Sequence, residues 1–275
     1  MIVWLALAPS LLGDQLVVQE ARRALEAERP VQAREMIARA VAAGATGPTV
    51  DYLLADLALV EGRWTEALVR YRALLAVAPS AKLQEQAGLA ALHAGQTTEA
   101  RALLEKAAEA PTAGWRTWNA LGVAADRRGD WESAGRAYAA AVAAAPGQAA
   151  SWNNLGWSRM LQGRWSEAMN ALRRAHALAP DQPRIAANLD LARSAVDGQL
   201  PQRRAGESGE AYAARLNDAG VLARLGGDPA KAAAAFAQAL EVSDRWFAPA
   251  AANLASVDRA ASPVSDKNAA PAQAR

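Results

Sequence analysis

A 34-residue period constrains the fold of this chain more than any other feature of its sequence. Seven pairs of identical residues stand 34 positions apart: Trp118/Trp152, Leu121/Leu155, Gly122/Gly156, Gly129/Gly163, Trp131/Trp165, Ala134/Ala168 and Pro146/Pro180. Self-similarity at a fixed period of this length is typical of proteins built from stacked structural repeats. We therefore expect copies of one small unit that pack against their neighbours.

The spacing inside the repeat 115–148 predicts two helices. Trp118, Leu121 and Gly122 share one helical face, at positions i, i+3 and i+4, and Gly129-Asp130 ends that helix. A second apolar stripe follows at Trp131, Ala134, Tyr138 and Ala141. Each repeat is thus expected to be an antiparallel helix pair that cannot bury its apolar face alone. Tryptophans 118, 131, 152 and 165 are expected in the core.

This pattern resembles the tetratricopeptide repeat (TPR) family. The segments Trp118-Asn119-Ala120-Leu121-Gly122 and Trp152-Asn153-Asn154-Leu155-Gly156 match its W-x-x-L-G motif. The tyrosine that usually follows this glycine by three residues is replaced by Ala125 or Arg159. The resemblance implies an all-α helix-turn-helix solenoid, a right-handed superhelix with capping helices.

Composition excludes several classes of protein. Alanine supplies about a quarter of the residues, which favours helices and argues against an all-β fold. Lys and Arg number 30 and Asp and Glu 28, which gives a net charge of +2. So small an excess produces no positive electrostatic field that would attract nucleic acid, so nucleic-acid binding is not expected. With no cysteine and two histidines, His93 and His176, neither a metal site nor a cofactor is expected.

Weaker copies of the repeat extend the pattern outward. The expected organisation is an apolar segment at 1–13, a TPR array with a capping helix at 14–196, a linker at 197–208, a TPR-like unit with its own capping helix at 209–260 and a disordered tail at 261–275.

The N-terminal segment has three interpretations. Ala6-Leu7-Ala8 fits an A-x-A cleavage pattern, so the segment is a candidate partial signal peptide, although no basic residue precedes it. It is also read as an extension that packs on the first helix pair, or as a membrane tether. Membrane association is expected only through this segment or through a partner. The bacterial periplasm or envelope is favoured over the cytoplasm.

No catalytic motif is present. The sequence contains no P-loop, no GxSxG and no GxGxxG after a strand, and the glycine-containing stretches fall at repeat turns. The chain is therefore not expected to be an enzyme.

The TPR resemblance also indicates a binding surface. In the family, the second, fifth, sixth, ninth and thirteenth positions of a repeat face the concave groove. The candidate peptide-binding residues are Tyr52, Lys82, Arg116, Asn119, Arg127, Asn153, Asn154, Trp157, Arg184 and Asn188. Asn amides can pair with a peptide backbone, Arg with carboxylates, and Trp can anchor apolar surface. Alternatively, Asn119 and Asn153 only bridge neighbouring helices, and Trp157 only packs between repeats.

The expected function is a non-catalytic scaffold that binds an extended peptide or helix of a protein partner in this groove. The central repeats are similar to those of TPR proteins of bacterial tight-adherence (Flp) pilus assembly, which implies an envelope, pilus or secretion assembly factor. Those proteins are typically lipoproteins, and this chain lacks the lipobox cysteine. The alternatives are a periplasmic maturation chaperone of the cytochrome-assembly type and a structural self-associating module. The chaperone-binding carboxylate clamp is not expected, because the fifth positions Tyr52, Glu85, Asn119 and Asn153 are not basic.

Overall fold

The computed structural model describes residues 8–261, and side chains within residues 17–259. Over this range the chain forms fourteen α-helices and no strand, which confirms the all-α prediction. It divides into a first unit of residues 1–146 and a second unit of residues 147–275.

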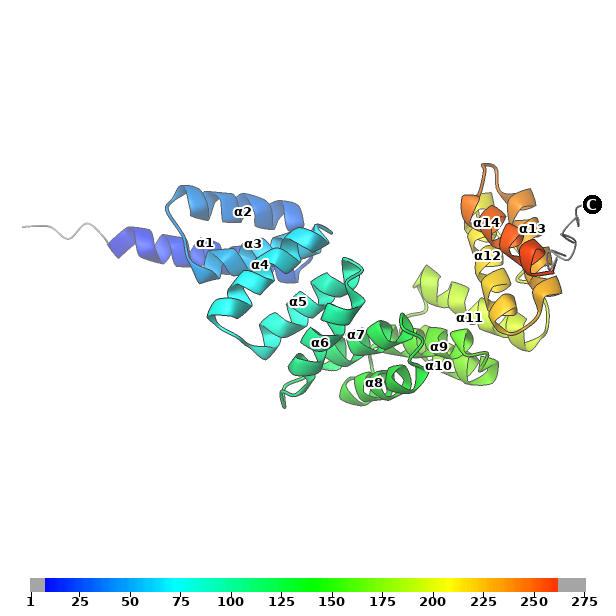
Figure 1. Cartoon of the computed structure of the whole chain (residues 1–275). Coiled ribbons are helices and arrows are strands. Elements are labelled where there is room, and N and C mark those ends of the chain that lie inside the picture. Colours follow the sequence, from blue (N-terminus) through cyan, green and yellow to red (C-terminus); the bar gives the residue numbers. More distant parts are fainter. Residues whose placement is uncertain (1–7, 262–275) are drawn as a thin grey trace, which may run out of the picture. The chain divides into compact units, whose positions relative to one another are not determined.

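The first unit consists of four consecutive helix pairs, which Figure 1 shows in blue to green. Their bounds are α1 Ala8–Glu26, α2 Pro30–Ala42, α3 Pro48–Val60, α4 Trp64–Val77, α5 Ala81–His93, α6 Thr97–Ala108, α7 Trp115–Asp126 and α8 Trp131–Ala144. One buried cluster joins α1, α2 and α3, and a second runs from α3 to α7. Every pair therefore shares its core with a neighbour, as a repeat array requires.

The second unit contains two helix pairs, each followed by a single helix. The bounds are α9 Ala149–Leu161, α10 Trp165–Leu178, α11 Pro183–Val196, α12 Gly209–Leu225, α13 Pro229–Val242 and α14 Ala248–Ala261. Leu222 of α12 joins Leu189 and Leu191 of α11 in one buried cluster. A second cluster, which includes the buried Phe236, holds α12, α13 and α14 together.

Local sequence signals set the ends of the helices. The Ser80 hydroxyl accepts a hydrogen bond from the Leu83 amide at 3.2 Å, and the Asp130 carboxylate accepts one from the Ser133 amide at 3.1 Å. Both caps satisfy amides that a helix leaves unpaired at its N-terminus. Gly129 and Gly163 turn the chain within their pairs at φ of 70° and 69°, a conformation that glycine adopts without strain.

Small residues let the two helices of a pair approach closely. A Cβ atom placed on Gly122 of α7 would lie 2.5 Å from the ring of Tyr138 on α8. Gly156 faces Leu172 in the same way, and Gly220 faces Phe236. The repeated glycine of the sequence motif is therefore a contact point between helices.

Replacing Gly122 by Ala should lower the free energy of unfolding by about 1–3 kcal/mol, because the new methyl group overlaps the Tyr138 ring. Gly147→Ala is the matched control, since a Cβ atom there meets nothing within 4 Å. Urea denaturation followed by circular dichroism measures both. Equal stability of the two variants would show that the helix pair tolerates a wider spacing.

The tryptophans lie less deeply than the sequence predicts. Trp131 is 37 % exposed, so its assignment to the core was wrong. Its ring lies 3.9 Å from the Cβ position of Gly129, beside the turn and not between the helices. Tryptophans 118, 152 and 165 are half-buried. Among the described residues, the fully buried aromatic side chains are instead those of Tyr71, Tyr138 and Phe236.

Residues 197–208 connect α11 to α12 and make specific contacts. Arg204 Nε donates to Asp190 Oδ2 at 2.7 Å, and the Tyr212 hydroxyl donates to the Pro201 carbonyl at 3.0 Å. Arg215, only 5 % exposed, donates to the Gln202 carbonyl at 2.7 Å. Hydrogen bonds therefore join this connection to both α11 and α12.

The predicted domain boundaries at 13, 196, 208 and 260 stay a proposal. The expectations for residues 1–7 and for the tail from residue 262 lie outside the described residues. None of the described helices combines the length and the hydrophobicity needed to cross a membrane.

Candidate functional site

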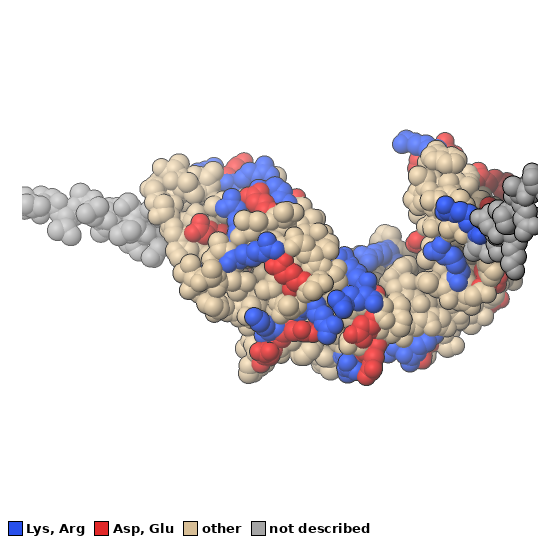
Figure 2. Space-filling view, viewed as in Figure 1, with Lys and Arg blue, Asp and Glu red and all other residues tan. Residues whose placement is uncertain are grey.

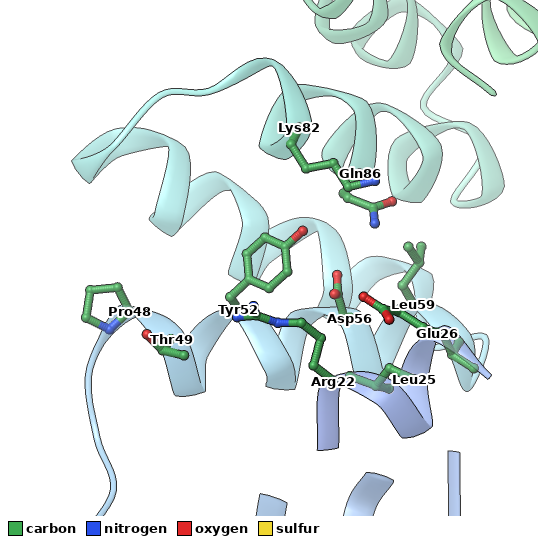
Figure 3. A pocket seen from close by; sticks show the side chains of 11 residues that line it. Arg22, Leu25, Glu26, Pro48, Thr49, Tyr52, Asp56, Leu59, Lys82 and Gln86 are labelled. Atoms are coloured by element: carbon green, nitrogen blue, oxygen red, sulfur yellow. The ribbon is translucent and has the colours of Figure 1, made fainter. Parts of the chain in front are cut away.

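A pocket of about 610 Å³ lies in the first unit between the first helices of three consecutive pairs. Figure 3 shows its side chains, which come from α1, α3 and α5. The lining residues are Arg22, Leu25, Glu26, Pro48, Thr49, Tyr52, Asp56, Leu59, Val60, Lys82 and Gln86. A volume of this size accommodates one or two side chains together with a stretch of peptide backbone.

The helical spacing of the lining residues explains why they meet. Tyr52, Asp56 and Val60 follow one another at four-residue intervals along α3, so they lie on one face of the helix. Arg22 and Glu26 have the same spacing on α1, as do Lys82 and Gln86 on α5. Three helices therefore present the same kind of face to one cavity.

Asp56 is the half-buried charged group of this pocket. It accepts a hydrogen bond from the hydroxyl of the fully buried Tyr71. Burial raises the pKa of the Asp56 carboxyl, while the Tyr71 hydrogen bond and the charges of Lys82 and Arg22 act in the opposite direction. Burial, followed by the Asp56 charge, raises the pKa of the neighbouring Tyr52 to about 12. The Tyr52 hydroxyl is therefore a hydrogen-bond donor at neutral pH.

The basic residues of the pocket are more exposed than Asp56. Lys82 Nζ lies 3.1 Å from Glu85 Oε1 on the next turn of α5. Glu85 also accepts a hydrogen bond from Thr117, which ties α5 to α7. Arg22 is an exposed residue of α1, and its side chain extends into the pocket.

Elsewhere on the surface, charges are largely balanced locally. Figure 2 shows many acidic side chains next to basic ones on the face in view. In the first unit, Arg34 Nε lies 2.8 Å from Glu61 Oε1, and Arg72 Nε lies 2.8 Å from Glu99 Oε1. Among the described residues, no group of three or more His, Asp or Glu side chains could hold a metal ion.

Comparison with protein families identifies the repeat. The tetratricopeptide repeat family matches residues 18–70, 52–114 and 119–183, which together make up more than half of the chain. The chain belongs to the tetratricopeptide repeat family. TPR proteins bind protein partners, and this fold is accordingly that of a protein-interaction scaffold.

Solved structures with the same fold agree with this assignment. PilW, a type IV pilus biogenesis factor, has a TM-score of 0.56 at 16 % identity, over 89 % of this chain and 97 % of its own. TTC0263, a thermophilic TPR protein of Thermus thermophilus, has a TM-score of 0.55 at 18 % identity, over 66 % of this chain and 98 % of its own. The APC/C complex Cut9-Hcn1 has 0.54 at 17 %, over 92 % of this chain but only 51 % of that chain. No curated protein matched the sequence.

The ten predicted groove residues of this TPR chain are divided equally between the two units. In the first unit, Tyr52 and Lys82 line the pocket. The guanidinium of Arg116 lies 5.0 Å from the centre of the Trp115 ring, and Arg127 donates to the Leu92 carbonyl of α5. Asn119 is half-buried on α7. These last three do not line the described pocket.

In the second unit, two of the predicted residues bond to each other. Asn188 Nδ2 on α11 donates to Asn153 Oδ1 on α9 at 2.8 Å, and both side chains are buried. Asn153 also donates to Asn154 Oδ1 at 3.3 Å. Asn217 and Asn253 repeat the arrangement between α12 and α14, at 2.9 Å. The amides of Asn153 and Asn188 thus form a hydrogen bond between two helices, as the alternative interpretation of Asn153 expected.

The other two members in this unit differ from each other. Trp157 is half-buried and packs against the cluster that contains Leu189 and Leu191. Arg184 is exposed at the start of α11.

Sequence reasoning missed the other polar residues of the pocket. In the repeats that begin at residues 14, 48 and 81, Arg22 and Asp56 occupy ninth positions, Glu26 a thirteenth and Gln86 a sixth. The family positions therefore contained the signal. The faint motif of the first repeat concealed Arg22 and Glu26, whereas Asp56 and Gln86 were overlooked in the same repeats that gave Tyr52 and Lys82.

Asn188→Leu should lower the free energy of unfolding by about 1–3 kcal/mol, because Asn153 Oδ1 loses its donor while remaining buried. The double variant Asn153→Leu/Asn188→Leu removes both partners and should recover part of this loss. Urea denaturation of the wild type, of the single variants Asn153→Leu and Asn188→Leu and of the double variant measures the coupling. A double variant that merely adds the two single losses would rule out a structural role of the pair.

Proposed function

We propose that this TPR chain is a non-catalytic scaffold and that the pocket between α1, α3 and α5 receives a segment of a protein partner. The observation that carries the proposal is the convergence of three consecutive first helices on one cavity. The cavity combines aliphatic walls at Leu25, Leu59 and Val60 with polar groups at Tyr52 and Gln86. Such a lining provides apolar contact together with hydrogen bonds to an extended backbone.

A second contact surface is proposed on the second unit, at Asn154, Trp157 and Arg184. Arg184 is exposed and Trp157 half-buried, so their side chains retain surface for a ligand. Arg116, Asn119 and Arg127 are proposed as further contacts on the first unit. Replacing Asn154, Trp157 and Arg184 together by Ala, with circular dichroism as the folding control, would weaken partner binding if this surface takes part.

We also propose that the partner belongs to a bacterial envelope, pilus or secretion assembly. The similarity of the two central repeats to TPR proteins of tight-adherence pilus assembly supports this pathway. PilW, itself a pilus biogenesis factor, adds a shared fold.

Site-specific photo-cross-linking in the native cell tests the proposal. A benzophenone amino acid replaces Val60, which lines the pocket and is 39 % exposed. The control position is Val69, which is 56 % exposed on α4 and outside the pocket lining. We expect one protein to be cross-linked through position 60 and not through position 69. The same products from both positions, or none from position 60, would contradict the pocket as the binding site.

The identity of the cross-linked protein decides the pathway. An envelope, pilus or secretion protein supports the assembly role. A second copy of this chain would instead favour the self-associating module.

A further inference from the structure

The charges of the pocket are distributed by depth, and this distribution indicates what the pocket takes. The half-buried carboxylate of Asp56 points into the cavity from α3, and the exposed Glu26 enters from α1 (Figure 3). Asp56 accepts its hydrogen bond from the neutral Tyr71 hydroxyl, and none of the ion pairs among the described residues includes it. A half-buried carboxylate without a cation within bonding distance is energetically costly.

The basic groups at the pocket do not neutralise Asp56 directly. Lys82 pairs with Glu85 at 3.1 Å, and its side chain is 59 % exposed. Arg22 is an exposed residue of α1. Charges in contact with water are screened, whereas the field of a half-buried carboxylate acts strongly at short range. A carboxylate of a ligand would meet the half-buried Asp56, so an acidic ligand is disfavoured.

The apolar walls of the pocket fit the methylene stem of a long basic side chain. Leu25, Leu59 and Val60 line the same cavity as Asp56. Lysine and arginine lay their methylene stems along apolar surface while the charged head reaches a polar partner.

We propose that the pocket receives a lysine or arginine side chain of the partner, with its stem against Leu25 and Leu59 and its cationic head on Asp56. This inference rests on the proposed function, since it names the chemistry of the segment bound at the same pocket. Tyr52 and Gln86, which hydrogen-bond to each other, line the cavity beside that side chain.

The test selects a random-peptide library displayed on phage against the full-length chain. Val60→Arg, which places a long side chain in the pocket, identifies the peptides that bind there. For each such peptide, every Lys or Arg is replaced by Met, and affinities are measured by fluorescence anisotropy. We expect one Lys→Met or Arg→Met replacement to weaken binding by at least about tenfold.

The Asp56→Asn variant then assigns the contact. Asn keeps an acceptor for the Tyr71 hydroxyl but removes the charge. In this variant the basic and the Met peptides should bind within about twofold of each other. Asp51→Asn, the same change at an exposed position of α3, should preserve the tenfold preference.

The outcomes separate the two proposals. Pocket peptides without a basic residue, or a preference that survives Asp56→Asn, would overturn the basic side chain and leave the proposed function intact. Failure of the wild type to select any peptide that Val60→Arg excludes would count against both.

Discussion

Arg215→Met is expected to lower the free energy of unfolding of the second unit by about 3–5 kcal/mol. Arg215 Nε and Nη2 donate to the two carboxylate oxygens of Glu207 at 2.8 and 2.7 Å. Only 6 % of the Arg215 side chain and 9 % of the Glu207 side chain are exposed. The methionine fills a similar volume but leaves the Glu207 carboxylate buried without its cation.

Urea denaturation at neutral pH measures this loss. Arg245→Met is the control, because the Arg245 side chain is 85 % exposed and its contact with Glu210 is 3.5 Å long. That variant should stay within about 0.5 kcal/mol of the wild type. A loss of the same small size for Arg215→Met would mean that residues 197–208 do not depend on the buried pair.

The same pair makes stability depend on pH. The Arg215 hydrogen bonds lower the pKa of Glu207 in the folded chain. A lowered folded pKa contributes stability above the unfolded pKa of about 4.3, and this contribution is lost as the pH falls through the lower, folded pKa. The stability difference between wild type and Arg215→Met should therefore shrink on acidification. A difference that stays constant or widens would contradict the pairing.

Tyr138→Ala is expected to lower the free energy of unfolding by about 3–5 kcal/mol. The Tyr138 side chain is 1 % exposed and its ring fills the space left by Gly122. Its hydroxyl also donates to Asp126 Oδ2 at 2.9 Å. Removing the ring opens a cavity between α7 and α8 and takes away this hydrogen bond.

Tyr138→Phe separates the two contributions. It keeps the ring and removes only the hydroxyl, so a smaller loss of about 1.5–3 kcal/mol is expected. Thermal and urea denaturation of both variants give the comparison. If Tyr138→Phe cost as much as Tyr138→Ala, the packing of the ring against Gly122 would not be the source of stability.

The fold could be predicted from the sequence because its determinants are local and repeated. Gly122 and Tyr138 recur in their roles as Gly156 with Leu172 and as Gly220 with Phe236. One repeat read correctly therefore describes the others. Trp131 was misjudged because motif position alone does not say whether a neighbouring helix covers a ring that lies beside a turn.

The site could be predicted only in part. The family positions placed Tyr52 and Lys82 correctly at the pocket. The same positions gave Asn153 and Asn188, which the packing of α9 and α11 buries against each other. Periodicity fixes the face of a helix on which a residue lies. It does not fix how closely the first helix of the following pair approaches that face. This distance determines whether the residue can contact a ligand or is covered by the neighbouring helix.

Binding of the partner segment identified by cross-linking tests the central claim most directly. Isothermal titration calorimetry compares the wild type with Val60→Arg, which blocks the pocket, and with Val69→Arg on α4 outside it. We predict at least a tenfold loss of affinity for Val60→Arg and no change for Val69→Arg. Equal affinity of the wild type and Val60→Arg would contradict the claim that the pocket of the first unit binds the partner.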